Sequence, residues 1–461
     1  MTPTAETDAS AAIAPSKTKE AAPNDLRKHQ VSLFGQISSP ERAAHQGVLS
    51  LADQGVASAT NFLTGVIIAR SCSKEELGLY MLGFSLVLFV TDLQTSLITT
   101  PYMVYAPRLQ GRAHALYTGS TLIHQLAFCL ITMFALMCGA LAISDGMGPT
   151  GLGPVMWALL LVIAFIMLRE HARRISFARL RLRAAFIFDT CIAVGQIGGL
   201  LVLAYFGLLS ASRAYWVIGS VCAIAVLGWL WSDRRCYDLQ VNESLTDLKK
   251  NWVLGKWVLA SALVWAVSMN LYPWLLAVFH GVASAGVWAA CVGVVSVGNP
   301  ILLGIQNFAG PKLAQKYATD GHSALYHLVI RMTVLLAVSV SLLCLALFIY
   351  GGRLVVLLYG FQYAGNGVVV ALLALNFLVG AIGFSFSRAL FALDLAWIDF
   401  SAVSVALLIM ITLGVWFVRG FGPLGAAIAL LGANSIVAAV RVIAFLTYPN
   451  RTLQVELRHA Q

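Results

Sequence analysis

Twelve stretches of the sequence are each apolar enough to cross a lipid bilayer, and this feature constrains the fold more than any other. A membrane-spanning helix needs about 20 mostly apolar residues. The stretches lie at roughly 47–69, 78–100, 117–144, 154–168, 185–206, 212–232, 257–279, 285–306, 332–350, 365–384, 395–418 and 423–447. Only 11% of the residues are charged, far fewer than in a soluble domain. We therefore predict an all-α polytopic membrane protein with twelve transmembrane helices.

The placement of the basic residues predicts the orientation of these helices. If the N-terminus is cytoplasmic, all but five of the 30 Lys and Arg fall on cytoplasmic segments. The exceptions are Arg70, Lys74, Arg213, Arg353 and Arg419. Basic residues concentrate on the cytoplasmic side of membrane proteins, so we expect both termini to be cytoplasmic. The net charge of +10 is explained by this bias, and we expect membrane lipids as partners and no nucleic acid.

The spans divide the chain into two halves of six helices each. We predict five segments, namely a disordered cytoplasmic arm at 1–46, an N-lobe at 47–232, a cytoplasmic linker at 233–256, a C-lobe at 257–448 and a cytoplasmic tail at 449–461. The arm lacks the apolar core of a signal peptide. Short motifs recur in the same order in both lobes, such as Phe206-Gly207 and Phe421-Gly422. Such echoes suggest a parallel duplication, as in two-lobed transporters.

The first predicted helix carries polar residues at spacings of three and four. They are Ser50, Asp53, Gln54, Ser58, Asn61 and Thr64. Lipid cannot satisfy such a stripe, so it must face other helices or water. Two interpretations remain open: hydrogen bonds that hold the helices together, and the lining of a hydrophilic central cavity.

Other polar residues stand near prolines inside predicted spans. Asp92 is followed by several threonines and Pro101, Asn270 stands close to Pro273, and Ser296 and Asn299 precede Pro300. Broken helices at matching positions of two lobes indicate a transport site. Kinks that serve only helix packing are the alternative.

Several arginines lie near the predicted cytoplasmic ends of the helices. Arg331, Arg388 and Arg441 either reach the lipid headgroups or line a vestibule that holds an anionic group. Arg174 belongs to a basic segment from Arg169 to Arg183 that follows the fourth span. This segment either anchors the topology or recognises a phosphate-bearing lipid.

The sequence gives little indication of catalysis. Ser73 and Glu76 have the spacing of a helix capping box, which explains the external carboxylates better than a catalytic base does. No GxxxxGK[ST], HExxH or GxSxG motif occurs, and no cysteines stand at CxxC spacing. We expect no enzyme activity, no metal site and no cofactor beyond an unidentified coupling cation.

Three regions carry a resemblance to a known superfamily. The stretch from Leu51-Ala52-Asp53-Gln54-Gly55 to Glu76-Leu77-Gly78 resembles the opening of the polysaccharide-transporter branch of the multidrug/oligosaccharidyl-lipid/polysaccharide (MOP) exporter superfamily. Residues 168–181 are similar to the cytoplasmic connection after helix four in some of those proteins. Leu358-Tyr359-Gly360 and Tyr363-Ala364 resemble the loop after helix nine.

The resemblance implies two six-helix bundles related by a pseudo-two-fold axis around a central cavity. It also implies an O-antigen-flippase-like activity in a bacterial inner membrane. Such a flippase moves a polyprenyl-diphosphate-linked oligosaccharide by alternating access. A polysaccharide polymerase and other export machinery are its candidate partners. Asp53, Gln54 and Asn61 replace arginines that some relatives carry in helix one, so these residues suit sugar hydroxyls better than pyrophosphate. The expected substrate-binding residues are Asp53, Gln54, Asn61, Asp92, Asn270, Arg174, Arg331, Arg388 and Arg441.

Two other classes remain open from the sequence. A cation-coupled exporter of small organic cations from the same superfamily would use Asp53 and Asp92 as its cation site. A membrane glycan polymerase or glycosyltransferase would need larger external loops than this sequence has.

Overall fold

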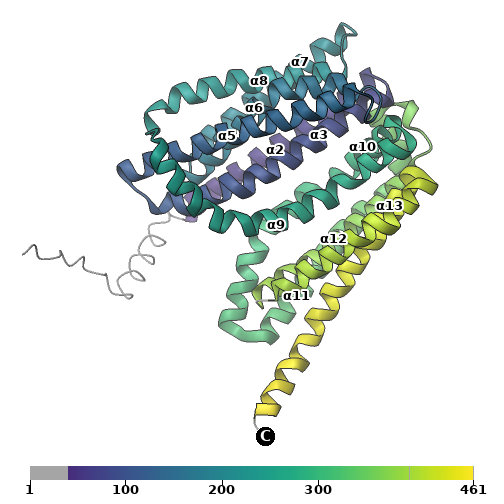
Figure 1. Ribbon diagram of the computed structural model, residues 1–461. Coiled ribbons are helices and arrows are strands. Elements are labelled where there is room, and N and C mark those ends of the chain that lie inside the picture. Colours follow the sequence, from purple (N-terminus) through teal and green to yellow (C-terminus); the bar gives the residue numbers. More distant parts are fainter. Residues whose placement is uncertain (1–39, 394, 460–461) are drawn as a thin grey trace, which may run out of the picture. The chain divides into compact units, whose positions relative to one another are not determined.

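The computed structural model describes residues 40–393 and 395–459, and every regular element in these ranges is a helix (Figure 1). Of the predicted arm at 1–46, residues 1–39 lie outside the described residues. Ser50–Gln461 form one compact unit, which is described here by itself. From Ser50 onwards, both predicted lobes belong to this unit.

The first half of the unit contains the predicted spans one to six. Its elements are α2 (Pro40–Ser71), α3 (Lys74–Gln94), the π-helix η1 (Thr95–Thr99), α4 (Thr100–Tyr105), η2 (Ala106–Arg108), α5 (Gly111–Ser144), α6 (Leu152–Ala178), α7 (Leu182–Tyr205) and α8 (Ala211–Asp233). The π-helix ends two residues before Pro101, so the helical segment that follows Asp92 is irregular. Ser73 caps α3 by accepting from the backbone N of Glu76, which confirms the predicted helix cap.

The second half begins inside the predicted linker. Its elements are η3 (Arg234–Cys236), α9 (Val241–His280), α10 (Val282–Ser296), α11 (Asn299–Tyr359), η4 (Phe361–Tyr363), α12 (Gly367–Ala392) and α13 (Ala396–His459). Residues 241–256 of the linker are thus the first turns of α9, and they pack against α5. Pro273 lies within α9 without ending it, whereas the predicted break near Ser296 separates α10 from α11.

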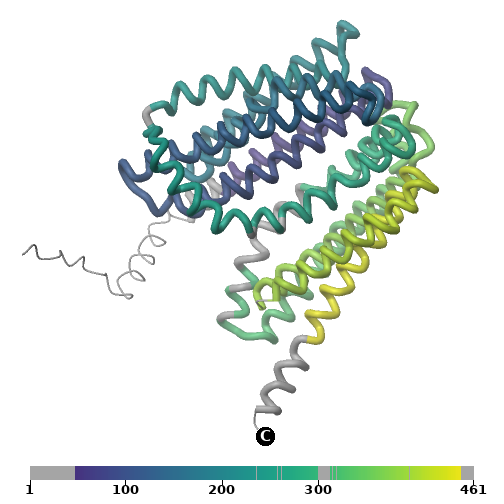
Figure 2. The backbone as a smooth tube through the Cα atoms, in the orientation of Figure 1, coloured from purple at the N-terminus to yellow at the C-terminus, as the bar shows by residue number. Residues whose placement is uncertain are grey.

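Helix length and hydropathy alone identify fewer candidate membrane spans in the described residues than the twelve predicted. Nine helical segments there are long and apolar enough to cross a membrane, so the protein is a multi-pass membrane protein and twelve spans remain a prediction. Three places account for the difference. The polar positions of α2 lower its hydropathy, α10 has only 15 residues, and α13 holds two predicted spans. Those two spans meet at Gly422, whose positive φ of 56° reverses the chain (Figure 2).

Two glycines allow α3 and α10 to pack closely. A Cβ atom at Gly78 would overlap the carbonyl oxygen of Val282, and one at Gly286 would overlap that of Lys74. Small residues permit such close approach of membrane helices, where dispersion contacts replace the hydrophobic effect. This crossing joins the two lobes at one end of the helices, which we call the closed end.

The buried core divides towards the opposite end. At the closed end one cluster joins side chains of both lobes, including Ile68 and Leu77 with Val282 and Tyr363. At the other end, which we call the divided end, two separate clusters are found. One contains only N-lobe residues around Tyr102, and the other contains only C-lobe residues. The lobes are therefore packed together at the closed end and have separate cores at the divided end.

The α3–α10 crossing predicts a stability effect for Gly286→Val. The added side chain forces the two backbones apart, and overpacking of this kind costs about 1–3 kcal/mol. We expect a lower midpoint of thermal unfolding in detergent, followed by tryptophan fluorescence. Gly228→Val in α8 is the matched control, because a Cβ at that position meets no atom within 4 Å. Equal midpoints for the two variants would contradict the close crossing.

Candidate functional site

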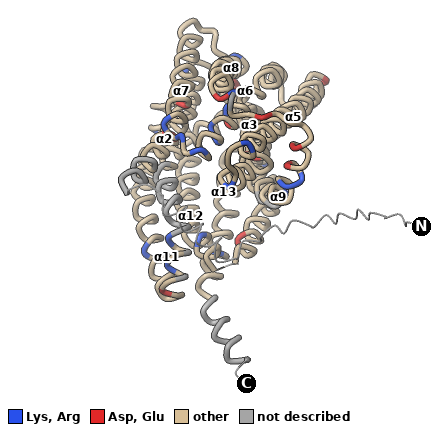
Figure 3. Tube along the Cα trace, turned by 90° about the vertical axis from the view of Figure 1, so that its left-hand side faces the viewer, with Lys and Arg blue, Asp and Glu red and all other residues tan. Residues whose placement is uncertain are grey.

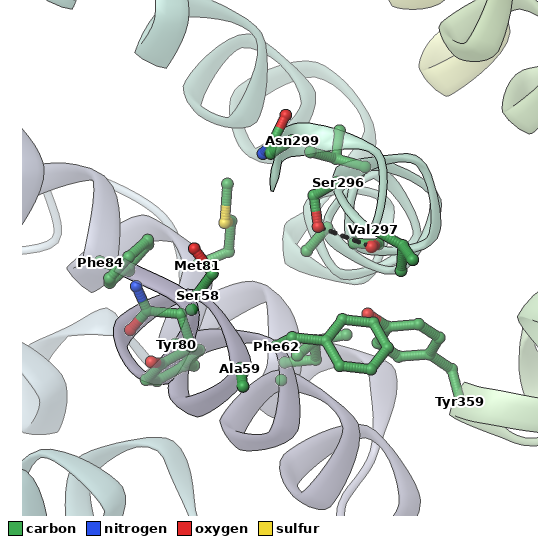
Figure 4. A pocket seen from close by; sticks show the side chains of 17 residues that line it. Ser58, Ala59, Phe62, Tyr80, Met81, Phe84, Ser296, Val297, Asn299 and Tyr359 are labelled. Carbon is green, nitrogen blue, oxygen red and sulfur yellow. Dashed lines mark hydrogen bonds between the residues drawn. The ribbon is translucent and has the colours of Figure 1, made fainter. Parts of the chain in front are cut away.

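A cavity of about 500 Å³ lies between the N-lobe helices α2 and α3 and the C-lobe helices α10 and α11 (Figure 4). It is lined by Gly55, Ser58, Ala59, Asn61, Phe62, Gly65, Leu77, Tyr80, Met81, Phe84, Ala289, Val292, Gly293, Ser296, Val297, Asn299 and Tyr359. None of these 17 residues is charged. The cavity therefore offers hydrogen bonds and aromatic surface without an ionic partner.

The polar groups of the cavity come from both lobes. Ser58 and Asn61 of α2 face Ser296 of α10 and Asn299 of α11. The Ser296 hydroxyl donates to the Gly293 carbonyl at 2.7 Å, and its oxygen can still accept. Each asparagine amide supplies both donors and an acceptor. Asn61 is a predicted site residue that the structure places on the cavity wall.

Aromatic rings complete the wall. The rings of Phe62 and Tyr359 meet edge to face, with centroids 6.4 Å apart, and Tyr359 contacts Tyr363 in the same manner at 6.1 Å. Figure 4 shows the Phe62 and Tyr359 rings side by side. Flat apolar surfaces beside amide groups suit a neutral ligand with many hydroxyls and C–H faces. Neither Phe62 nor Tyr359 was predicted as a site residue, although both stand in stretches that carry the superfamily resemblance.

Asp53 lies elsewhere, in an ion-pair network inside the N-lobe. Its carboxylate is 1% exposed and lies 2.7 Å from Nη2 of Arg173 on α6. Nε of Arg173 is also 2.7 Å from Asp189 of α7, and Arg169 donates to Asp189 at 2.8 Å. Arg173 is thus shared between two buried carboxylates. Gln54 is half-buried and does not line the cavity.

The network is electrically balanced. Glu170 accepts from Nε of Arg174 at 2.7 Å and lies 3.7 Å from Arg173. Three arginines, Arg169, Arg173 and Arg174, therefore face three carboxylates, those of Asp53, Glu170 and Asp189. Buried charges are tolerated only when they are paired in this manner. The predicted site residue Arg174 belongs to this network, which gives it a structural partner.

The remaining predicted site residues are dispersed. Asp92 is half-buried near η1 and interacts electrostatically with Arg174. Asn270 donates to the Ala266 carbonyl of its own helix at 2.8 Å. Arg441 is paired with Asp399 at 2.7 Å. None of these residues lines the cavity.

Arg331 and Arg388 differ from the other predicted arginines. Both are exposed, and neither has an ion-pair partner among the described residues. The Arg388 guanidinium lies over the rings of Phe384 and Phe391, at 5.0 and 5.5 Å from the centroids. Both arginines belong to the C-lobe near the divided end.

At the closed end a set of hydrogen bonds joins the lobes. Arg70 at the end of α2 donates from Nε to the Leu358 carbonyl at 2.9 Å and from Nη2 to the Leu357 carbonyl. In return, Gln362 of the α11–α12 loop donates to the carbonyls of Ala69 and Cys72, at 2.8 and 3.2 Å. We call this set the latch. The carbonyls it uses are the unpaired ones at helix ends, so both helices gain a partner from the opposite lobe.

Similarity to solved structures identifies the fold. The chain matches an inward-facing multidrug-resistance MATE transporter of the MOP superfamily with a TM-score of 0.70, at 16% identity, over 86% of this chain and 94% of the other. It also matches the lipid II flippase MurJ in an inward closed conformation, with a TM-score of 0.68 at 14% identity over 88% of both chains. A MOP-superfamily transporter from Pyrococcus furiosus, described as having a binding pocket of reversed polarity, matches with a TM-score of 0.62 at 13% identity over 89% and 96%.

No family model and no curated protein sequence matches the chain. The structural matches nevertheless show that the chain has the fold of MOP-superfamily transporters, as the sequence resemblance implied. The proteins in these matching structures are described as a multidrug-resistance transporter and a lipid II flippase.

The ion-pair network predicts the effect of Asp53→Asn. Loss of this carboxylate leaves Arg173 buried with one partner fewer, and breaking a buried ion pair costs up to about 3–5 kcal/mol. We expect a clearly lower midpoint of thermal unfolding. Ser58→Ala on the same helix should change the free energy of unfolding by no more than about 0.5 kcal/mol. An unchanged midpoint for Asp53→Asn would show that the network does not stabilise the N-lobe.

Proposed function

We propose that this protein is a flippase that moves a polyprenyl-diphosphate-linked oligosaccharide across a bacterial inner membrane by alternating access. In this proposal the glycan occupies the cavity between the lobes while the polyprenyl chain stays in the lipid. Both termini are cytoplasmic, and the product is passed to a polysaccharide polymerase. The protein thereby serves the biosynthesis of a surface polysaccharide.

The uncharged wall of the cavity carries this proposal. A glycan is recognised by hydrogen bonds to its hydroxyls and by aromatic contact with its C–H faces. Asn61, Asn299, Phe62 and Tyr359 offer both kinds of contact from opposite lobes. A ligand that bridges the lobes in this manner binds differently when they move, which is the requirement for coupling binding to a conformational change.

The state of the two ends supports the direction of transport. The latch and the shared core close the end that the basic residues predict to be periplasmic. The cores are separate at the predicted cytoplasmic end. This arrangement suits loading from the cytoplasmic leaflet, where lipid-linked glycans are assembled. The similar fold of MurJ, a lipid II flippase, is consistent with this cargo.

The second candidate function is export of small organic cations, which the fold similarity to a multidrug MATE transporter favours. A cation site needs a carboxylate that the ligand can reach. Asp53 is held by Arg173, and neither Asp53 nor Asp92 lines the cavity. The cavity therefore favours the glycan over the cation.

Complementation of a flippase-deficient strain tests the proposal. We expect the wild-type protein to restore surface polysaccharide. Asn61→Leu combined with Asn299→Leu should lower the amount by about 30-fold, because each amide loses a hydrogen bond worth about 1 kcal/mol. Leu130→Ala, at an exposed position of α5 outside the cavity, is the control.

Two outcomes of this experiment count against the proposal. Full polysaccharide from the double variant would remove the cavity from the mechanism. Resistance to cationic drugs, gained without any restored polysaccharide, would favour the second candidate.

The latch predicts that Arg70→Ala with Gln362→Ala makes the closed end open more readily. Cys72 reports this change, because its thiol donates to the Leu209 carbonyl at 3.4 Å beside the latch. Burial, helped by Glu76, raises the pKa of this thiol to about 11, so it stays protonated and unreactive at neutral pH. Exposure would return the pKa towards its ordinary value near 8.5 and raise the thiolate fraction at pH 7 by about 300-fold.

The measurement is the rate of maleimide labelling in a chain that retains Cys72 as its sole cysteine. Arg419→Ala is the control, since this exposed arginine lies outside the latch. Equal labelling rates for the wild type and the latch variant would mean that these hydrogen bonds do not hold the closed end shut.

A further inference from the structure

Tyr359 belongs to the cavity wall and to the closed end at the same time. It is the last residue of α11, which ends at Gly360 with a positive φ of 104°. Its side chain is buried and lines the cavity. The carbonyls of the two residues before it, Leu357 and Leu358, accept the latch hydrogen bonds from Arg70. One turn of α11 therefore carries a residue of the cavity wall together with the acceptors of the latch.

The other half of the latch has the same relation to an aromatic ring. Gln362 donates to two carbonyls of the N-lobe, and the next residue in the chain is Tyr363. The ring of Tyr363 is fully buried and meets that of Tyr359 edge to face, with centroids 6.1 Å apart. Tyr359 in turn meets Phe62 of α2 at 6.4 Å. We call these three residues the ring cluster, and each half of the latch is next in the chain to one of its rings.

The phenol of Tyr359 is seated against the backbone of α10. A Cβ atom at Gly293 would overlap Oη of Tyr359 and would lie 3.0 Å from its Cζ, so only glycine leaves room for this hydroxyl. Figure 4 shows the ring reaching from the end of its helix to the ring of Phe62. Among the described residues none forms a hydrogen bond with the hydroxyl. It can therefore donate to, or accept from, an occupant of the cavity.

Contacts without charge must carry any effect of an occupant on the closed end. Most positions along the helices are uncharged (Figure 3), and no residue of the cavity wall carries a charge. Phe62 and Arg70 stand eight residues apart on α2, which is about 12 Å along the helix axis. The ring cluster and the latch thus hold α2 to the end of α11 at two levels, one beside the cavity and one at the closed end.

We propose that Tyr359 is a positioning residue that couples occupancy of the cavity to the latch. A hydroxyl of the occupant that bonds to Oη of Tyr359 draws the ring away from Gly293. The ring then moves the turn of α11 whose carbonyls hold Arg70. An empty cavity keeps the closed end shut, and an occupant that prefers the displaced ring favours its opening. The inference rests on the proposed function only in taking the glycan as this occupant.

A double-variant cycle tests the link between ring and latch without any cargo. The readout is maleimide labelling of Cys72, as the sole cysteine of the purified full-length protein in nanodiscs. Gly293→Ala fills the seat of the phenol, and we expect faster labelling by about 10-fold, since overpacking of this size shifts a two-state equilibrium by that much. Adding Tyr359→Phe removes the overlapping hydroxyl and should return the rate to that of the wild type.

Gly65→Ala is the matched control for labelling. It adds the same methyl group to the cavity wall at a place where no atom lies within 4 Å, so the rate should stay unchanged. A wild-type rate in Gly293→Ala would overturn the proposal. A faster rate that Tyr359→Phe does not reverse would also overturn it, because the effect would then come from α10 and not from the tyrosine.

A second arm uses the cargo and needs only Tyr359→Phe, so it decides the question even if Gly293→Ala does not fold. Labelling is compared in membranes from the complemented strain and from the same strain without the first glycosyltransferase of the glycan. We expect the lipid-linked glycan to speed labelling of the wild type and of Leu130→Ala, but not of Tyr359→Phe. An equal response of all three proteins would contradict the role of the hydroxyl.

The failure of this inference differs from the failure of the proposed function. A wild type that restores surface polysaccharide but shows no response of Cys72 to the glycan overturns the coupling and leaves the flippase proposal standing. Rescue of Gly293→Ala by Tyr359→Phe, in a protein that restores no polysaccharide, supports the link between ring and latch and contradicts the proposed function.

Discussion

The polar side chains of α2 cannot face lipid, and the way the structure satisfies them organises the rest of the molecule. Successive residues of an α-helix are rotated by about 100°, so the polar positions fall on two neighbouring faces. Asp53, Thr60 and Thr64 lie on one face and are buried. Asp53 meets Arg173, and Thr64 accepts from Gln196 at 2.8 Å. Ser58 and Asn61 lie on the adjacent face and line the cavity.

This division resolves the two interpretations that the sequence left open, because both apply to different residues. Helix-to-helix contact explains the face of Asp53, and cavity lining explains the face of Asn61. The spacing of three and four predicted a polar helix. It did not predict which polar residues face protein and which face the cavity, because the stripe also includes direct neighbours such as Asp53 and Gln54. The partners of Asp53 and Thr64, Arg173 and Gln196 respectively, lie more than 100 positions further along the chain.

Other features were predictable to different degrees for physical reasons. Apolar length predicted the helices, because each run depends only on its own residues. The break after Ser296 and the reversal at Gly422 were also expected from local residues. The latch was not predicted, because Arg70 and Gln362 act on backbone carbonyls across almost 300 residues. The pairing of Arg441 with Asp399 likewise depends on how α13 folds back on itself.

The closed and divided ends give the two lobes different freedom. At the closed end, backbones approach at Gly78 and Gly286, and the latch adds hydrogen bonds between the lobes. At the divided end each lobe has its own core, so the lobes can separate there without exposing a shared one. In the transport cycle that we propose, the protein changes state by exchanging contacts at the closed end for contacts at the divided end.

A scan of single cysteines along α2 tests the central claim most directly. The claim is that water reaches one face of this helix and protein covers the neighbouring face. We predict that cysteines at positions 58 and 61 react with a small, polar, membrane-impermeant thiol reagent. Those at positions 60 and 64 should stay unreactive in the folded protein. Equal protection at all four positions would mean that the space between the lobes is dry, and the case for translocation would fail.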